Sequence, residues 1–246
     1  MLHVYYRLTP ADRPDKRPAF FSKKGALLNF LAALRAVPSA RLRVIYDSAE
    51  RDHEILSVLP RTVEIDHQGR LGNSGSIRYA YDLAVRLPGD DLVYFVEDDY
   101  LHVPNSLSVL NRAATDLKAD YLTLYDHPVR YADEYPWGLD LPTRHTRILL
   151  AADHHWRCQE STCMTFAARV RTLQADREIF LRYTARDVPE DRELFRRLQG
   201  LIGYERGSPF RVLLGPMPSL ATHCHESWLA PARDWRSIYE ASAVSS

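Results

Sequence analysis

The sequence lacks the features that mark several large classes of protein. It has only three cysteines, Cys158, Cys163 and Cys224. They form an odd set without the paired spacing of a metal site, which favours reduced thiols in a cytoplasm over a disulfide framework. No segment approaches the roughly 20 apolar residues that span a bilayer, and the amino terminus has no basic region followed by a long apolar stretch. The sequence therefore predicts a soluble, cytoplasmic protein without a transmembrane segment.

The chain also lacks net charge. Its 32 lysines and arginines balance 32 aspartates and glutamates, so no overall electrostatic attraction draws it to nucleic acid or to an anionic membrane. Any anionic ligand must therefore be held by local groups. The sequence has no internal repeat and no composition break sharp enough to mark a linker, and 246 residues are enough for one full hydrophobic core. We expect a single domain over residues 1–246.

An apolar run that ends in three acids is the most informative feature of the chain. Residues 93–100 read VYFVEDDY. Such a run is typical of a strand buried on both faces of an α/β sheet, and ligands of these sheets bind beyond the carboxyl ends of the strands. The carboxylates of Glu97, Asp98 and Asp99 repel one another unless a cation offsets their charge, and carboxylate oxygens suit Mg²⁺ or Mn²⁺. The triplet predicts a divalent-metal site, and a solvated acidic turn is the alternative.

Short apolar runs alternate with helical patterns through the first half, as in the βαβ units of an α/β fold. The pattern predicts strands at 3–7, 42–46, 62–65, from Val93, and at 121–125, with helices at 24–35, 53–59, 76–86 and 104–117. Later segments predict strands at 162–166 and 212–214, helices at 167–176 and 189–201, and an irregular tail at 216–235. We therefore expect a mixed, mainly parallel central sheet flanked by helices.

Two further segments point to a nucleotide. Asp47 closes the expected strand at 42–46, so a parallel sheet brings it to the same edge as the acidic triplet. There it can accept a hydrogen bond from a base or ribose, and a turn or helix cap is the alternative. The segment GRLGNSGSIRYAYDLA at 69–84 places Asn73 among glycines before a helix that carries Arg78, which favours a phosphate or nucleotide, and a loop with a helix cap is the alternative. It lacks the P-loop and Rossmann spacings, so ATPase and dehydrogenase functions lose support.

Two polar groups lie later in the chain. His223 and His225 stand beside a glutamate in the irregular tail, where an imidazole can bind a metal or donate to a phosphate leaving group. We prefer His223, and a structural histidine is the alternative. Glu190 and Asp191 open an expected helix, and a carboxylate with a free edge can act as a general base. A capping cluster that complements the helix dipole is the alternative for this pair.

An acceptor surface is expected after the strand at 121–125. Tyr125, Asp126 and Trp137 lie there outside any periodic pattern, and aromatic faces stack on sugars. A loop packed on the core is the alternative. Glu160 is a further candidate to approach the acceptor, and it is the alternative base if Asp191 faces away.

Taken in order over residues 2–235, these segments resemble the GT-A nucleotide-sugar glycosyltransferases. They are similar in style to glycosyltransferase family 2 and to the Golgi N-acetylglucosaminyltransferases, whose motif is also Glu-Asp-Asp. The triplet departs from the commonest DXD motif because it begins with Glu97 rather than aspartate. The resemblance implies a Rossmann-like GT-A domain with a nucleotide-binding half at 1–120, an acceptor-binding half at 121–235 and a tail at 236–246.

The resemblance also implies roles for the matched residues. In the nucleotide site, Asp47 would meet the base, and Asn73 and Arg78 would line the site. Glu97 and Asp98 would lie by the ribose and the sugar.

At the reacting centre, the resemblance implies that Asp99 binds a divalent ion, Mn²⁺ or Mg²⁺, that bridges the diphosphate, with help from His223. Asp191, with Glu190 as its rival, would deprotonate the acceptor hydroxyl in a direct displacement that inverts the anomeric carbon. The metal would offset the charge that grows on the departing nucleoside diphosphate.

The expected activity is therefore sugar transfer from a nucleoside-diphosphate sugar, with a UDP-sugar favoured by the resemblance, to an acceptor that the sequence does not identify. Two alternatives are a metal-dependent phosphohydrolase or nucleotidyltransferase, which also uses Asp and His at strand ends, and a nucleotide-sugar-binding module without turnover. Inverting and retaining members share this architecture, so the sequence leaves the stereochemistry open, and it leaves the oligomeric state open too.

Overall fold

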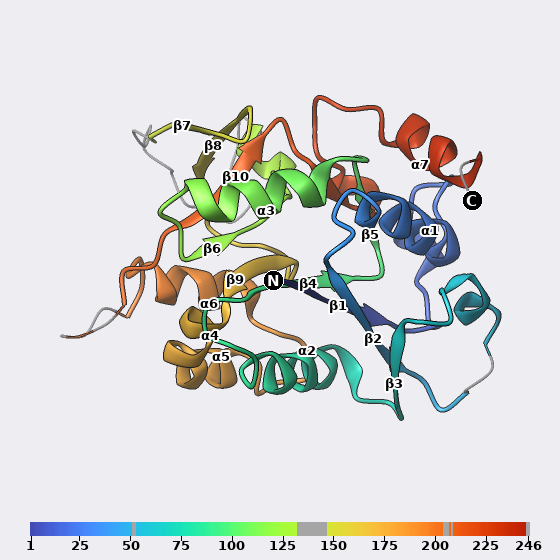
Figure 1. The fold of residues 1–246 in the computed structure, drawn as a ribbon, viewed down its shortest axis with the longest axis horizontal. Coiled ribbons are helices and arrows are strands. Elements are labelled where there is room, and N and C mark those ends of the chain that lie inside the picture. Colours follow the sequence, from blue (N-terminus) through green and yellow to red (C-terminus); the bar gives the residue numbers. More distant parts are fainter. Residues whose placement is uncertain (51–52, 132–146, 204–206, 208, 245–246) are drawn as a thin grey trace.

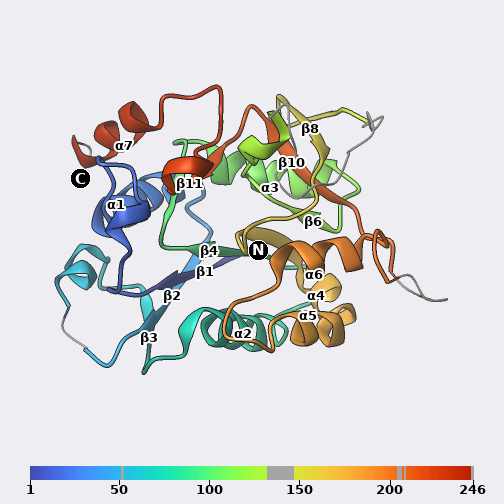
Figure 2. The same ribbon diagram turned by 180° about the vertical axis from the view of Figure 1, so that it is seen from behind.

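The computed structural model describes residues 1–50, 53–131, 147–203, 207 and 209–244. Within these ranges, nine strands form one sheet in the order β3-β2-β1-β4-β9-β6-β10-β8-β7 (Figures 1 and 2). The strands are β1 (Leu2–Leu8), β2 (Arg41–Asp47), β3 (Glu64–Gln68), β4 (Leu92–Glu97), β6 (Tyr121–Leu122), β7 (Leu149–Ala151), β8 (His154–Cys158), β9 (Phe166–Arg169) and β10 (Leu213–Met217). A small second sheet pairs β5 (Tyr100–His102) with β11 (Ala221–His223).

Most strands of the large sheet run in one direction. β3, β2, β1 and β4 are mutually parallel, and β6 is parallel to β10. β9 is antiparallel to both of its neighbours, β4 and β6, so those two point the same way. β8 is antiparallel to β10 and to β7. The prediction of a mixed, mainly parallel sheet is confirmed, with β8 and β9 as the reversed strands of the described chain.

Helices cover both faces of this sheet. They are α1 (Lys23–Leu34), α2 (Gly72–Ala84), α3 (Ser106–Asp116), α4 (Val170–Ala175), α5 (Arg177–Tyr183), α6 (Asp191–Leu198) and α7 (Trp235–Val244), with 3₁₀ turns at Pro14–Lys16, Glu54–Val58, Pro128–Tyr131 and Glu226–Trp228. α1, α3 and α7 lie on one face and α2, α4, α5 and α6 on the other (Figures 1 and 2). No helix in the described ranges combines the length and apolar character needed to cross a membrane.

The sheet separates two hydrophobic cores. Along β1, Val4 and Tyr6 face the core beneath α1 and α3, whereas Tyr5 faces the core beneath α2. Along β4, Tyr94 faces the core beneath α1 and α3, and Phe95 faces the core beneath α2. A strand that buries both faces needs apolar side chains at successive positions, which explains why these strands read as continuous apolar runs.

Several expected boundaries were wrong. α2 begins at Gly72 rather than at residue 76, so Gly72 and Gly75, which were expected in a loop, belong to its first turn. The strand expected at 162–166 is a loop, and β9 begins only at Phe166. The alanines at 167 and 168, expected in a helix, lie in this central strand because sheet pairing on both sides overrides their helix propensity. The expected tail at 236–246 belongs largely to α7, which packs on α1.

Candidate functional site

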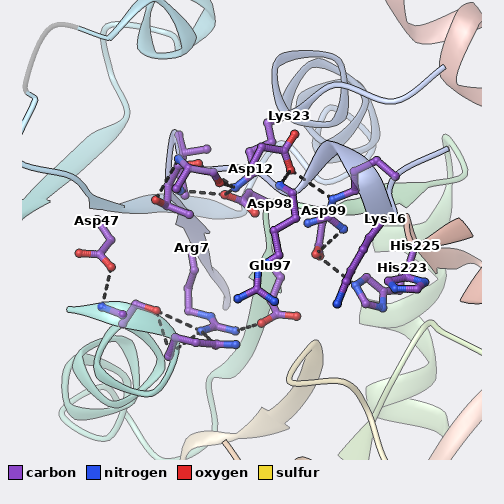
Figure 3. A pocket seen from close by; sticks show the side chains of 18 of the residues that line it. Arg7, Asp12, Lys16, Lys23, Asp47, Glu97, Asp98, Asp99, His223 and His225 are labelled. Atoms are coloured by element: carbon purple, nitrogen blue, oxygen red, sulfur yellow. Dashed lines mark hydrogen bonds and ion pairs between the residues drawn. The ribbon is translucent and has the colours of Figure 1, made fainter. Parts of the chain in front are cut away.

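A pocket of about 550 Å³ lies at the carboxyl edge of β1, β2 and β4 (Figure 3). Parallel strands end together there, so residues distant in sequence meet around one cavity. Its charged and imidazole lining residues are Arg7, Asp12, Arg13, Lys16, Arg17, Lys23, Asp47, Glu97, Asp98, Asp99, His223 and His225. Asn73 also lines it. Of the sequence-predicted residues, the structure therefore brings together Asp47, Asn73, the acidic triplet and His223.

Each acid of the triplet has a basic partner. Glu97, at the end of β4, pairs with Arg7 of β1. Asp98 Oδ2 accepts hydrogen bonds from Lys23 Nζ at 2.9 Å and from the backbone N–H of Thr9 at 2.7 Å. The pocket is therefore built on buried ion pairs rather than on a solvated acidic turn.

Asp99 has two cationic neighbours. Its Oδ2 atom lies 2.9 Å from Arg17 Nη1 and 3.1 Å from His223 Nε2. Its Oδ1 atom is buried and has no hydrogen-bond partner among the described residues. Among the described residues, Asp99 is therefore the acid of the triplet with a buried oxygen to which nothing donates.

These surroundings move the three carboxylate pKa values apart. Burial raises the pKa of Glu97 to about 7 against the opposing charge of Arg7, and it raises the pKa of Asp98 against Lys23. Burial alone would raise the pKa of Asp99 too, but His223 and Arg17 outweigh it and hold that pKa well below its usual range. Asp99 is therefore the most firmly ionised member of the triplet.

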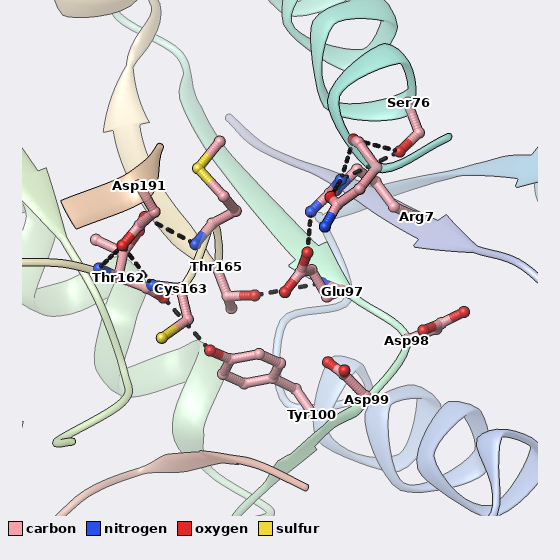
Figure 4. A network of polar contacts seen from close by, with 12 residues as sticks. Arg7, Ser76, Glu97, Asp98, Asp99, Tyr100, Thr162, Cys163, Thr165 and Asp191 are labelled. Atoms are coloured by element: carbon pink, nitrogen blue, oxygen red, sulfur yellow. Dashed lines mark hydrogen bonds and ion pairs between the residues drawn. The ribbon is translucent and has the colours of Figure 1, made fainter. Parts of the chain in front are cut away.

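Arg7 joins the triplet to the start of α2 (Figure 4). Its Nη1 atom donates to Asn73 O and Oδ1, both at 3.0 Å, and to Ser76 Oγ at 3.1 Å, while Nη2 reaches Glu97. One guanidinium thereby fixes the first turn of α2 relative to the end of β4. The side chain of Asn73 is already engaged by this contact.

Asp47 caps α2. Its carboxylate accepts hydrogen bonds from the backbone N–H groups of Leu71 and Gly72, the latter at 2.8 Å. The capping role that was the alternative for Asp47 is therefore present, and Asp47 lines the pocket as well. Arg78 is exposed on α2 and is not among the residues that line the pocket.

His223 reaches the pocket through the small sheet. It pairs with Tyr100 in the β11–β5 register, and the two rings stack with centroids 5.5 Å apart. The backbone N–H of Cys224 donates to Asp99 O at 2.7 Å, which joins the two strands at the pocket. Burial lowers the pKa of His223, but the carboxylate of Asp99 outweighs it and the pKa is raised. His225 instead accepts from Ser227 N and caps a 3₁₀ turn.

The Asp99–His223 pair carries the donor types of a divalent-cation site, although His223 Nε2 here contacts Asp99 Oδ2 at 3.1 Å. A buried carboxylate oxygen without a partner and an imidazole nitrogen are donors that Mn²⁺ takes, and Mg²⁺ accepts the oxygen. Across the described ranges, no group of three or more His, Cys, Asp or Glu side chains is placed to hold a metal ion. A cation here would therefore complete its shell with ligand phosphate oxygens and water, as Mg²⁺ commonly does.

Asp191 holds a loop beside the pocket (Figure 4). Oδ1 accepts from Thr162 Oγ1 at 2.7 Å and Met164 N at 2.9 Å, and Oδ2 accepts from Thr162 N and Cys163 N at 3.0 Å each. Cys163 and Met164 have φ values of 48° and 53°, in the left-handed region that non-glycine residues avoid. The loop continues to Thr165, whose Oγ1 accepts from Glu97 N at 3.3 Å. Both carboxylate oxygens of Asp191 are thus engaged, and neither edge is free.

The other expected acceptor and base residues lie outside the pocket lining. Glu190 pairs with Arg186 at 2.8 Å and is part-exposed. Glu160 is 7% exposed, with Arg130 Nη1 at 3.6 Å and Arg192 Nη2 at 3.9 Å.

Two expected acceptor residues are buried. Tyr125 donates through its hydroxyl to Trp228 O at 2.6 Å. Asp126 is 1% exposed and accepts from Arg157, Gln159 and Tyr131. Both are packed on the core, which was the alternative to an acceptor surface. Trp137 lies outside the described residues.

Comparisons with known proteins give a likeness of fold. No protein-family model and no curated protein sequence matches the chain. Similar solved structures include TarS from S. aureus, with 14% identity over 71% of this chain and 29% of that chain and a TM-score of 0.42. Another is a galactosyltransferase, LgtC, in complex with donor and acceptor sugar analogs, with 10% identity over 99% of this chain and 95% of that chain and a TM-score of 0.49. A third is CMP:2-keto-3-deoxy-manno-octonic acid synthetase complexed with CTP, with 11% identity over 99% of this chain and 98% of that chain and a TM-score of 0.49.

The chain spans only part of the TarS proteins, 29% of one TarS chain and 49% of a structure of TarS 1–349. GT-A glycosyltransferases and nucleotidyltransferases, both considered from the sequence, are represented among the similar structures. Because the identities and TM-scores are low, the site rests on the geometry of this chain itself.

Sequence reasoning missed the basic half of the site. Arg7 stands in the mainly apolar strand LHVYYRL, where a charged residue is uncommon, and that position is the signal that marks it. Arg17 and Lys23 belong to a stretch with five basic residues between positions 13 and 24. The signal was therefore the local density of positive charge after β1 in a chain without net charge.

Proposed function

We propose that the chain is a glycosyltransferase that takes a nucleoside-diphosphate sugar as donor and binds it in the pocket beside Asp99. The observation that carries the proposal is the meeting of Asp99 and His223, 124 residues apart in sequence, 3.1 Å from each other in a cavity at the strand edge. A cavity of about 550 Å³ is within the ~300–1,000 Å³ range of small-molecule sites.

In this proposal, Asp99 and His223 would hold a divalent ion, Mn²⁺ or Mg²⁺, whose charge offsets that of the diphosphate when it is bound. The fixed donors and charges of the chain complete the donor site. Arg7 keeps the start of α2 and Glu97 in one arrangement, so the cavity is preformed and needs little reorganisation on binding. Uridine is the base favoured by the family resemblance.

The reaction proposed is a direct displacement with inversion. The acceptor oxygen forms a bond to the anomeric carbon while the bond from that carbon to the phosphate oxygen breaks, and the electron pair leaves with the nucleoside diphosphate. The acceptor proton passes to a carboxylate at the start of α6. We assign this role to Glu190 rather than to Asp191. An oxygen of Glu190 is paired only with the exposed Arg186. Each of the two oxygens of Asp191 already accepts two hydrogen bonds.

Ligand-dependent thermal stability tests the donor site. UDP, GDP, CDP and ADP are added with Mn²⁺ or with EDTA to the wild type, to Asp99→Asn and to the matched control Asp116→Asn, an exposed acid on α3. We expect one nucleotide to stabilise the wild type and the control with Mn²⁺ only, since a ligand at about 100 times its Kd adds ~2.7 kcal/mol. The shift is expected to disappear in Asp99→Asn. Absence of any nucleotide shift in the wild type would end the glycosyltransferase proposal.

A nucleotidyltransferase is the second candidate, and the density of basic residues after β1 favours it. Such an enzyme joins a nucleoside monophosphate unit to an acceptor phosphate and releases pyrophosphate, so its substrate carries more negative charge than a nucleoside diphosphate. Product analysis separates the candidates. Release of pyrophosphate from a nucleoside triphosphate supports nucleotidyl transfer, release of a nucleoside diphosphate with a new glycoside supports sugar transfer, and inorganic phosphate alone indicates a phosphohydrolase.

A further inference from the structure

The charges that line the pocket are mostly neutralised within the protein. Five carboxylates and five lysine or arginine side chains surround the cavity. The internal pairs are Arg7 with Glu97, Lys23 with Asp98, and Arg17 with Asp99 and Asp12, while Asp47 is engaged by backbone N–H groups. These pairs leave little charge free to meet a ligand.

Two cations of the pocket stand outside these pairs. Arg13 and Lys16 line the cavity and are exposed, and within the described residues their side chains have no ion pair or hydrogen bond. Their two positive charges bring the Lys and Arg side chains of the lining to the same number as its carboxylates. Because no protein carboxylate holds them within the described residues, Arg13 and Lys16 are the cations of the lining that are free to meet an anion.

The segment that carries them is fixed in place. Residues Pro14–Lys16 form a 3₁₀ turn, with backbone hydrogen bonds from Lys16 N to Arg13 O at 3.1 Å and from Arg17 N to Pro14 O at 3.2 Å. Arg17 then anchors the turn, because its guanidinium contacts Asp99 and donates to Cys224 O at 2.9 Å. The turn thus holds Arg13 and Lys16 at the cavity without using their charges.

Positive charge gathers on the side of the pocket near β11. Lys16 lies on the same side as His223 and His225 (Figure 3). An anion bound on this side of the pocket therefore has a lysine and two imidazoles among its neighbours.

We propose that the turn at residues 13–17 is a phosphate-binding arm, in which Lys16 and Arg13 contact the terminal phosphate of the bound nucleoside diphosphate. The proposal rests on the donor site proposed above and adds the residues that recognise its charge. Lysine supplies a point charge to a phosphate, and arginine supplies two parallel N–H donors. The arm therefore distinguishes a diphosphate from a monophosphate or a nucleoside by charge and reach.

The test is a comparison of three ligands with one base. The ligands are the nucleoside, the monophosphate and the diphosphate of the base selected in the thermal experiment. Each ligand is titrated calorimetrically into the wild type, Lys16→Met, Arg13→Met and the control Lys24→Met. Lys24 is an exposed lysine of α1 that does not line the pocket. Titrations run with EDTA and again with Mn²⁺, so the contribution of the arm is measured with and without a metal.

We expect the wild type and Lys24→Met to bind the diphosphate more tightly than the monophosphate. Lys16→Met and Arg13→Met are each expected to weaken diphosphate binding about tenfold, a change of ~1.4 kcal/mol, and to leave nucleoside binding unchanged. Both changed residues are exposed, so unaltered melting temperatures without ligand confirm that the variants fold.

The possible failures are distinguishable. A wild type that prefers the diphosphate, with variants that keep the full preference, overturns the phosphate-binding arm and leaves the proposed function intact. A wild type that binds none of the three ligands overturns the donor site and the arm together. Equal weakening of nucleoside and diphosphate binding also overturns the arm, because it shows a loss of shape rather than of charge recognition.

Discussion

Replacing Asp191 with asparagine removes an acceptor from the loop at residues 162–164. The amide keeps one carbonyl oxygen and turns the other position into an N–H₂ donor. If the carbonyl takes the place of Oδ1, the backbone N–H groups of Thr162 and Cys163, each 3.0 Å from Oδ2, meet a donor instead of an acceptor. A hydrogen bond to a charged group contributes about 1.5–3 kcal/mol, so the loss of two predicts destabilisation by ~3–6 kcal/mol.

The backbone of the loop makes this dependence stronger. Cys163 and Met164 adopt positive φ, a conformation that costs of order 1–3 kcal/mol for each such residue and persists only where neighbours enforce it. Without the carboxylate we expect the loop to rearrange, which also disturbs the contact between Thr165 and Glu97 N. The variant should therefore lose both stability and activity.

Urea unfolding and turnover are measured together on Asp191→Asn and two comparison variants. Thr162→Val removes only the hydroxyl bond of 2.7 Å and should cost about half as much, while Asp187→Asn, an exposed acid of the same segment, should change the free energy of unfolding by less than about 0.5 kcal/mol. The reasoning is refuted if Asp191→Asn unfolds like the wild type but loses turnover by about 10²–10⁴-fold, the range for a general base. Asp191 would then be the base, and the assignment of Glu190 would be wrong.

Two further predictions concern the core beneath α1. His102 is fully buried, and burial lowers its pKa to about 3. Below about pH 6.5 the imidazole therefore binds a proton in the unfolded chain but not in the folded chain. The contribution of His102 to the free energy of unfolding is present at neutral pH and falls by ~2 kcal/mol from about pH 7 to 5. Urea titrations of His102→Gln should show a pH dependence smaller by that amount, whereas exposed His155→Gln should keep the full dependence, and equal slopes in all three proteins would contradict the burial argument. A Cβ at Gly25 would lie 2.0 Å from Tyr239 Oη and 2.4 Å from its ring, so Gly25→Ala should push α7 from α1 and lower the free energy of unfolding by about 1–3 kcal/mol. Tyr239→Ala in the same chain should remove most of this penalty, and an additive loss in the double variant would show that the two side chains do not clash.

The sequence was a good guide where a pattern is local. β1, β2 and β4 bury both faces, so they read as apolar runs, and the polar residue that ends each run marks the edge where the pocket forms. Asp47 and the triplet were found in this way. His223 was found from its chemistry, although the small sheet that brings it to Asp99 was not predicted.

The remaining features depend on contacts between distant segments. β9 has the short sequence FAAR, and it becomes a central strand only because β4 and β6 flank it. Asp191 was expected to present a free edge, yet three of its four hydrogen bonds come from backbone N–H groups almost 30 residues away, which carry no side-chain signal. Arg7 was unremarked because its partners, Asn73 and Glu97, lie 66 and 90 residues further along the chain.

The order in which the pocket is assembled has a consequence for synthesis of the chain. Asp99 is made 124 residues before His223, and at roughly 5–20 residues per second a ribosome needs about 6–25 seconds to cover that interval. During this time the carboxylate has Arg17 but lacks its imidazole neighbour, and β5 lacks β11. The nascent chain therefore carries an incomplete, charged cavity beside an unpaired strand for that interval, in which a chaperone or a misfolding event has time to act.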